Sequence, residues 1–240
     1  MNISAPPQNI LQAIGLTKQY GPTRALDGVS IGFAEGTSTA IMGASGSGKT
    51  TLLHLLAGIV APDHGTVSYS QAEIGSLSDA NRSRLRREQF GFVFQQGLLV
   101  PELTAAENVA LALMLNGMSK REAIVPATQW LAALGLGGME DRRIGELSGG
   151  QAQRVAIARS QVTGARIVFA DEPTGALDST TSREVMDALL GSTIGQGRTL
   201  VVVTHDPSIA ARCQRVVTLS DGRIIGDVLN TAASEAGAAR

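Results

Sequence analysis

The sequence predicts an α/β fold with a mostly parallel sheet, an N-terminal antiparallel β part and a helical insertion. Short apolar runs alternate with helical patterns, which is typical of a parallel sheet covered on both faces. One strand leads into a glycine-rich loop, and a later strand ends in two adjacent carboxylates. The 240 residues are 43% hydrophobic, which is enough for one large domain.

Apolar patterns and turn residues predict the elements before the insertion. Gly21-Pro22 separates the first two strands, Gly58 ends the first helix, and Pro62–Gly65 is predicted to form a turn. Ser78 is a candidate cap for the second helix. In order, we expect strands over 10–20, 25–33 and 37–42, a helix over 50–57, a strand over 66–69, a helix over 78–87 and a strand over 90–94.

The middle of the chain changes to consecutive helices, predicted as an insertion at about residues 96–160. Thr104 and Ser119 are candidate N-caps, and Glu107 stands at capping-box spacing from Thr104. We expect helices over 103–115 and 119–134, a helix ending near 162, strands over 166–170, 199–204 and 216–219, and a helix over 180–190. Residues 1–229 are predicted to form a single domain, and residues 230–240 a flexible tail.

Composition narrows the classes of function. The net charge of −1 and an aromatic content of 3% argue against nucleic acid as a partner. Cys213 is the single cysteine, and we interpret it as a small buried residue of a protein from a reducing compartment. Met1–Gln8 lacks the pattern of a secretory signal, and the apolar run Val109–Leu115 is too short to span a bilayer. We therefore expect any membrane role to be peripheral.

The run Gly43-Ala44-Ser45-Gly46-Ser47-Gly48-Lys49-Thr50-Thr51, called the phosphate loop below, fits G-x-x-x-x-G-K-[ST]. Its glycines allow backbone N–H groups to converge on an anion, and the following helix adds the positive end of its dipole. The Lys49 ammonium suits the outer phosphates, and the Thr50 hydroxyl is a hard ligand for Mg²⁺. A flexible Gly/Ser turn that matches by chance is the alternative. The loop predicts a P-loop NTPase core that binds the phosphates of a nucleotide together with Mg²⁺.

Asp171 and Glu172 follow an apolar strand, at the end where open α/β sheets bind ligands. With a phosphate loop upstream, Asp171 is predicted to hold Mg²⁺, directly or through water. Glu172 is the candidate general base that orients and deprotonates the attacking water. The alternative is an exposed acidic start to a loop.

Ser148-Gly149-Gly150 stands at a predicted helix start and offers a hydroxyl and unsatisfied N–H groups. Taken alone, these residues would be a plain N-cap. One chain cannot easily present two anion-binding helix ends to one γ-phosphate from opposite sides, whereas two chains can. The combination predicts a dimer with ATP at its interface.

Together these residues resemble the ABC-type ATPases, the nucleotide-binding subunits of ABC transporters. The run Leu147-Ser148-Gly149-Gly150-Gln151 matches the signature motif of that family without change. The resemblance extends from about Leu11 to Val228 and implies the ABC ATPase fold and hydrolysis of ATP in a head-to-tail dimer.

The resemblance implies four further roles. Tyr20 is similar to the aromatic residue that stacks on adenine, although it could be an ordinary strand tyrosine. Gln95 is similar to the glutamine that contacts Mg²⁺ and water and senses the membrane partner. Asp178 resembles the residue in the loop that couples the two sites of the dimer. His205 resembles the histidine that holds the γ-phosphate, although taken alone it could be a packed histidine.

A finer resemblance, to the macrolide-exporter and lipoprotein-release branch, rests on residues 85–95, 103–109, 172–178 and 204–207. Ala44, Gln96-Gly97 and Ala152 depart from the family pattern without removing a catalytic group. The branch implies a few-helix permease with a large extracytoplasmic domain as partner, and a location at the cytoplasmic face of the membrane.

Two alternatives stay open beside export or mechanical work across the membrane. One is a mechanotransmission module that regulates an extracytoplasmic enzyme or sensor. The other is a soluble ABC ATPase, which is disfavoured because the chain has neither a long coiled-coil insertion nor two tandem ATPase units. The substrate depends on the membrane partner.

Overall fold

The computed structural model describes residues 9–95 and 97–230, which divide into two compact units. The first unit contains the described residues up to Arg82 and those from Gly197 onward, and the second unit is Ser83–Gln196. The boundary falls within helix α2 (Asp79–Gln89). Of the predicted tail, residues 231–240 lie outside the described residues, and the single domain over 1–229 stays a prediction.

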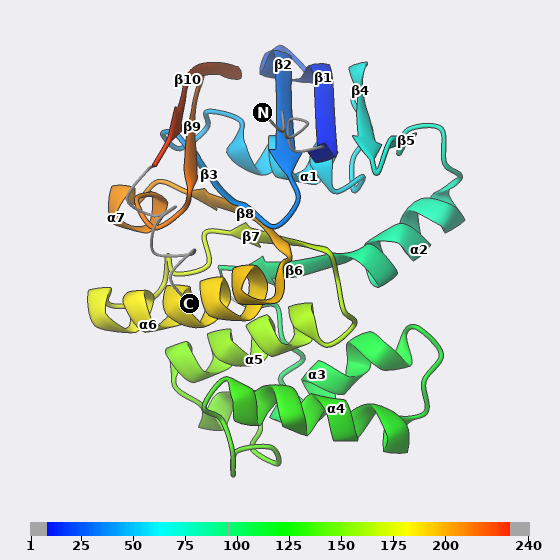
Figure 1. Ribbon diagram of the computed structural model, residues 1–240, viewed down its shortest axis with the longest axis vertical. Helices are drawn as coiled ribbons and strands as arrows, with labels where there is room; N and C mark the ends of the chain where they lie inside the picture. The colour runs from blue at the N-terminus through cyan, green and yellow to red at the C-terminus, as the bar shows by residue number, and fades with distance from the viewer. Residues whose placement is uncertain (1–8, 96, 231–240) are drawn as a thin grey trace, which may run out of the picture. The chain divides into compact units, whose positions relative to one another are not determined.

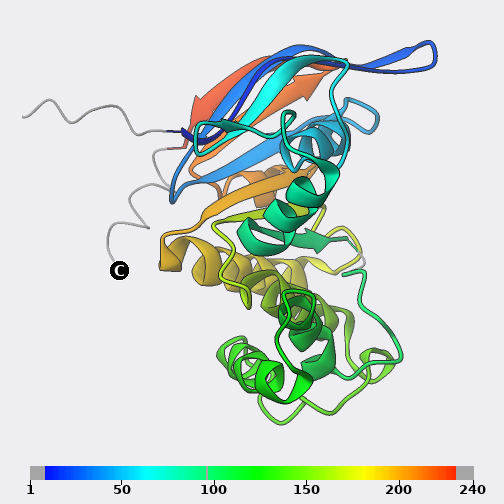
Figure 2. The same ribbon diagram turned by 90° about the vertical axis from the view of Figure 1, so that its right-hand side faces the viewer.

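An antiparallel sheet forms one layer of the first unit, in the strand order β2-β1-β4-β5 (Figure 1). Its strands are β1 (Asn9–Tyr20), β2 (Thr23–Ala34), β4 (His64–Tyr69) and β5 (Ala72–Glu73). Leu11 and Ala13 of β1 and Val29, Ile31 and Phe33 of β2 are buried, because alternate residues of a strand face the same side. Leu16 and Leu26 are buried as well, beyond register shifts in the β1–β2 pairing that change the alternation. Figure 2 shows the turn between β1 and β2 (blue) extending away from the other strands of this unit.

A second group of strands in the first unit has the order β10-β9-β3-β8. It consists of β3 (Ser38–Met42), β8 (Thr199–Thr204), β9 (Arg215–Ser220) and β10 (Arg223–Leu229). The pairs β3–β8 and β3–β9 are parallel, and β10 pairs antiparallel with β9. All six residues of β8 are buried, as expected for a covered parallel strand. Helices α1 (Lys49–Leu56) and α7 (Pro207–Ala210) lie wholly in this unit, which also contains the start of α2.

The second unit combines a parallel strand pair with a helical layer. The pair is β6 (Phe90–Phe94) and β7 (Ile167–Asp171). The helices are α3 (Ala105–Met114), α4 (Lys120–Ala133), α5 (Gly149–Gln161) and α6 (Ser179–Thr193), with short 3-10 turns at η1 (Ile144–Glu146) and η2 (Ile194–Gln196). Phe169 joins the strands by packing edge-on to Phe90 at 5.3 Å between ring centroids and stacking on Phe92 at 5.7 Å.

Side-chain caps explain where the helices of the second unit begin. Thr104 accepts a hydrogen bond from the amide of Glu107, and the carboxylate of Glu107 accepts one from the amide of Thr104. Ser119 and Glu122 form the same reciprocal pair at the start of α4. Such a cap stabilises a helix by about 1 kcal/mol. Both predicted caps are therefore confirmed.

The predicted fold class is confirmed: parallel pairs, an antiparallel N-terminal part and consecutive helices between β6 and β7 are all present. One predicted turn is partly wrong, because His64 and Gly65 belong to β4. Gly65 has a φ of +88°, and a Cβ there would lie 2.5 Å from the backbone of Gly15. Strand β4 thus starts at His64, earlier than predicted, and its first residues pair irregularly with β1. The sequence patterns also missed β5, β10 and α7.

Across the described stretches 9–95 and 97–230, no helix has the length and apolar character needed to cross a bilayer.

Candidate nucleotide-binding site

The phosphate loop joins the end of β3 to the start of α1 in the first unit. Gly46 and Gly48 have φ angles of +79° and +102°, in the region that favours glycine. A Cβ at Gly48 would lie 2.3 Å from the carbonyl oxygen of Ala25, and one at Gly43 would lie 2.3 Å from that of Leu219. Glycine is therefore favoured at Gly46 by its conformation, at Gly43 by close backbone packing, and at Gly48 by both.

Helix α1 differs at its N-terminus from the helices that follow it. Its N-cap is Gly48, which offers no side-chain hydrogen bond, and its first turn carries no acidic residue. Helices α3, α4, α5 and α6, by contrast, are each capped by a side chain, from Thr104, Ser119, Ser148 and Asp178. The positive end of the α1 dipole therefore faces an anion site without a competing side-chain acceptor at its N-cap.

Two buried polar groups complete the loop. Lys49 is 8% exposed, and its ammonium donates hydrogen bonds to the carbonyl oxygens of Gly43 and Ala44, both at 2.8 Å. The Ser47 hydroxyl is buried and has no hydrogen-bond partner among the residues that the structure describes. A cation and an unpaired hydroxyl within a glycine cradle suit a phosphate group.

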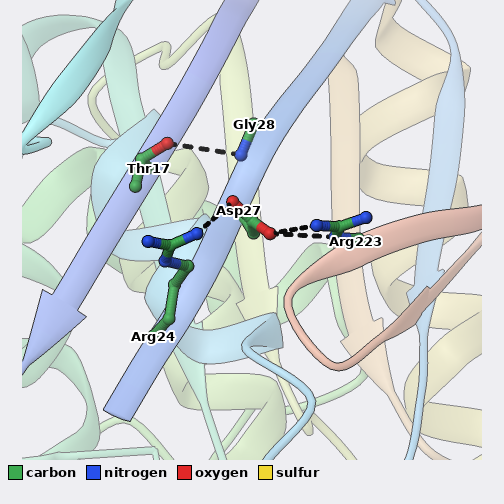
Figure 3. A network of polar contacts seen from close by, with 5 residues as sticks. All are labelled: Thr17, Arg24, Asp27, Gly28 and Arg223. Atoms are coloured by element: carbon green, nitrogen blue, oxygen red, sulfur yellow. Dashed lines mark hydrogen bonds and ion pairs between the residues drawn. The ribbon is translucent and has the colours of Figure 1, made fainter. Parts of the chain in front are cut away.

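A network of hydrogen bonds outside the loop supports it, and Figure 3 shows the part of this network around Asp27. The amide of Gly222, in the turn between β9 and β10, donates to the carbonyl of Ser47 at 3.1 Å, and the amide of Asp27 donates to the carbonyl of Gly222 at 2.9 Å. The Asp27 carboxylate accepts from Arg223 Nε at 2.9 Å and from Arg24 at 3.0 Å. The hydrogen bond from Arg223 is the main cause that lowers the pKa of Asp27. Sequence reasoning missed this network, because it joins residues far apart in the chain.

Tyr20 and His205 are the other candidate residues of the first unit. Tyr20 ends β1 and is 50% exposed, and the Lys18 ammonium lies over its ring, 5.6 Å from the centroid. His205 directly follows Thr204, which pairs with Met42 at the start of the phosphate loop. Because β3 and β8 are parallel, the structure brings His205 and the loop to the same edge of these strands.

In the second unit, Gln95, Asp171 and Glu172 lie at one edge of the strand pair. Phe94 pairs with Asp171, so Gln95 and Glu172 both follow directly at that edge. Glu172 has a φ of +47°, a left-handed conformation that costs about 1–2 kcal/mol for a residue with a Cβ. A Cβ at Gly175 would lie 2.9 Å from Gln95 Nε2, so Gly175 leaves room for the glutamine side chain.

The residues Ser148–Gln151 and the residue Asp178 also come together within the second unit. Ser148 caps α5 in a reciprocal pair with Gln151, at 2.9 and 3.2 Å. Asp178 caps α6 and accepts hydrogen bonds from Thr181, which lower the pKa of its carboxyl. A Cβ at Gly150 would lie 2.4 Å from Thr181 Cγ2. The two helix starts therefore pack closely enough to require glycine between them.

Comparisons with known proteins identify the family of this chain. The sequence profile of the ABC transporter family matches residues 26–175. The chain is 42% identical over 223 residues to the lipoprotein-releasing system ATP-binding protein LolD of Geobacter metallireducens, covering 91% of this chain and 99% of that protein. It is 42% identical over 233 residues to the macrolide export ATP-binding/permease protein MacB of Hyphomonas neptunium, covering 95% of this chain and 36% of that protein.

The chain thus spans about a third of the length of the macrolide export relatives it matches. Its fold is also similar to that of a solved ATP-binding cassette, determined as a dimer in a post-hydrolysis state bound to ADP and Pi. The TM-score is 0.83 at 37% identity, covering 92% of this chain and 98% of the other.

Proposed function

This chain belongs to the ABC transporter family of ATP hydrolases, and we propose that it is the ATP-binding subunit of a membrane complex that does export or mechanical work. The observation that carries the proposal is the phosphate loop, in which a buried lysine and an unpaired serine hydroxyl stand beside a helix start without a side-chain cap. The similarity to lipoprotein-releasing and macrolide export proteins supports the membrane role.

In the proposed mechanism, the phosphate loop binds the phosphates of ATP and the exposed ring of Tyr20 stacks on adenine. The Lys49 ammonium stabilises negative charge on the outer phosphates. His205 donates a hydrogen bond to the γ-phosphate. The Glu172 carboxylate orients the attacking water and accepts its proton as the new P–O bond forms and the bond to ADP breaks.

The donor set proposed for Mg²⁺ is the Thr50 hydroxyl, the Gln95 side-chain oxygen and the Asp171 carboxylate. These are hard oxygen ligands, and one carboxylate together with substrate phosphates and waters is the usual coordination of this ion. Among the described residues, no group of three His, Cys, Asp or Glu side chains could hold a metal. In the proposed site the ion would bind together with the nucleotide, and it would neutralise phosphate charge there.

We place Ser148–Gln151 and Asp178 at the ATP of a second copy of the chain. The α5 helix start offers a hydroxyl and N–H groups to a γ-phosphate, and its packing against the α6 start would let one protomer supply both elements. The dimeric cassette bound to ADP and Pi is a precedent for two-fold assembly in a similar fold. ATP would then close a head-to-tail dimer.

The proposed membrane partner is a permease, which would hold the chain at the cytoplasmic face. Exposed apolar side chains in the second unit support a contact with such a partner. They are Leu98, Met114, Leu115, Met118 and Val125, which are between 37% and 62% exposed.

Two substitutions test the assignment of ATP hydrolysis. Glu172→Gln should lower turnover about 100-fold or more while leaving ATP binding intact and enriching the dimer, because it removes the base alone. Lys49→Ala should weaken ATP binding itself. Turnover, nucleotide affinity and sedimentation of the purified variants are the measurements. Parental turnover in Glu172→Gln would overturn the base assignment.

Mixing variants tests the shared site. Ser148→Ala should impair the site formed with the phosphate loop of its partner. In mixtures with Lys49→Ala chains, half of the sites in mixed dimers carry both defects and half carry neither, so activity should partly recover. Activity that never exceeds the sum of the two separate variants would argue against a site shared between copies. Mass spectrometry of the membrane protein that copurifies from detergent extracts tests the proposed permease.

A further inference from the structure

Two side chains of α5 contact the backbone on both sides of Gln95. The Gln153 amide nitrogen donates to the carbonyl of Phe94 at 2.9 Å. The Arg159 guanidinium donates to the carbonyl of Gly97 at 2.6 Å and to that of Leu98 at 2.8 Å. The same helix begins at the Ser148 cap. The backbone next to Gln95 is therefore attached to the helix that presents the signature residues.

The backbone that Arg159 holds has an unusual conformation. Gly97 and Leu98 have φ angles of +67° and +45°, so two successive residues are left-handed. For Leu98 this conformation costs about 1–2 kcal/mol. Its side chain is 62% exposed, so burial offsets little of that cost. Two hydrogen bonds from one guanidinium therefore stabilise this backbone, in addition to the hydrogen bond from the Gly97 amide to the Phe94 carbonyl.

Arg159 depends on these carbonyls in turn. Burial lowers the pKa of its guanidinium, which means that the charged form has lost part of its hydration. Among the described residues, the hydrogen bonds of the Arg159 side chain go to these two backbone carbonyls. Gln153 is only 4% exposed, so its amide also needs an internal acceptor. Moving this backbone would leave buried polar groups unpaired.

We propose that Arg159 and Gln153 are positioning residues for hydrolysis. They keep Gln95 at a fixed position relative to Ser148 at the start of α5. The inference rests on the proposed role of Gln95 at the nucleotide. Because α5 begins at the Ser148 cap and carries both contacts, a movement of the helix is transmitted to the Gln95 backbone as well. The side chains act through Gln95 and touch no substrate themselves.

The amide of Gly97 reports on this backbone without requiring activity. It donates a hydrogen bond to Phe94 at 2.8 Å, next to the Gln153 contact. Arg159→Met removes two hydrogen bonds from a charged donor, so exchange of this amide, followed by NMR, should accelerate about 10- to 100-fold. Turnover should fall about tenfold while the KM for ATP changes less than twofold, because the phosphate loop is untouched.

Two further variants make the test specific. In Leu98→Gly, the glycine adopts the left-handed conformation without strain. Arg159→Met should therefore accelerate exchange of the Gly97 amide less in the Leu98→Gly protein than in the parent. Arg154→Met is the matched control: it removes an arginine from the same helix, but Arg154 pairs with Glu184 at 2.7 Å and makes no contact with the Gly97 and Leu98 carbonyls. It should leave exchange at Gly97 unchanged.

The inference is wrong if the Gly97 amide of folded Arg159→Met exchanges at the same rate as in the parent protein. It is also wrong if Arg154→Met accelerates that exchange equally. Should Arg159→Met not fold, Gln153→Met provides the same measurement through the Phe94 contact, and unchanged exchange there is equally decisive. Faster exchange with unaltered turnover would also reject a positioning role. An inactive parental protein, with exchange responding as expected, would instead reject the proposed function.

Discussion

The amide of Gly222 donates a hydrogen bond to the carbonyl of Ser47 at 3.1 Å, so the turn between β9 and β10 supports the phosphate loop. Gly222 is itself held by the amide of Asp27, whose carboxylate binds Arg24 and Arg223 (Figure 3). The conformation of the loop therefore depends on residues about 175 positions further along the chain as well as on its own glycines.

Gly222→Ala should weaken ATP binding. Gly222 has a φ of +73°, and a Cβ would lie 2.8 Å from the carbonyl oxygen of Ala25, so the turn must shift away from Ser47. We expect a loss of affinity of about tenfold, corresponding to about 1.4 kcal/mol. Gly197→Ala is the matched control, because Gly197 has a φ of +70° but nothing within 4 Å of a Cβ. Calorimetric titration with ATP that fails to separate the two variants would contradict the prediction.

Asp27→Asn should destabilise the protein in a pH-dependent way. Arg223 is the main cause that lowers the pKa of Asp27 in the folded protein below its ordinary value of 3.8. The unfolded chain therefore binds more protons near that pH, and stability rises with pH there. The contribution is complete above the unfolded pKa of about 3.9 and is lost as the pH falls through the lower folded pKa.

The difference in Tm between parent and Asp27→Asn, measured by thermal unfolding, should be constant at neutral pH and narrow below about pH 4. In an Arg223→Met background the difference should be smaller at every pH, because the main partner is absent. A difference that does not vary with pH would show that Asp27 acts through its shape rather than its charge.

Glu172→Gly should be more stable than Glu172→Ala. Both variants lose the carboxylate and should be inactive, but the φ of +47° at this position costs alanine about 1 kcal/mol more than glycine. Chemical denaturation measures this difference. Equal stability, or a more stable alanine variant, would mean that the left-handed conformation is not retained without the glutamate.

Local patterns predicted most of the fold. The caps at Thr104 and Ser119 and the strand Phe90–Phe94 match the structure because their signals lie within a few residues. Strand β10 was missed because Ile225, Val228 and Leu229 are exposed and give no pattern of a buried face. β5 has only two residues, too few for any pattern.

The sequence also identified the phosphate loop, and the structure shows the cradle that its glycines form. The hydrogen bonds that support the site could not be predicted. Those from Gly222 to Ser47 and from Arg159 to Leu98 are accepted by backbone carbonyls, which every residue type has. The positive φ of Glu172 and Leu98 could not be predicted either, because this conformation is normally favoured by glycine. The catalytic roles of the candidate residues stay predictions.

Cys213 has a practical consequence for future experiments. Burial raises the pKa of its thiol to about 12, and it is the only cysteine of the chain. The thiolate is the reactive form, so this residue is unreactive toward maleimides near neutral pH. A cysteine introduced at an exposed position would be labelled alone. Cys213 therefore does not have to be replaced before a labelling cysteine is introduced for fluorescence or spin-label distance measurements.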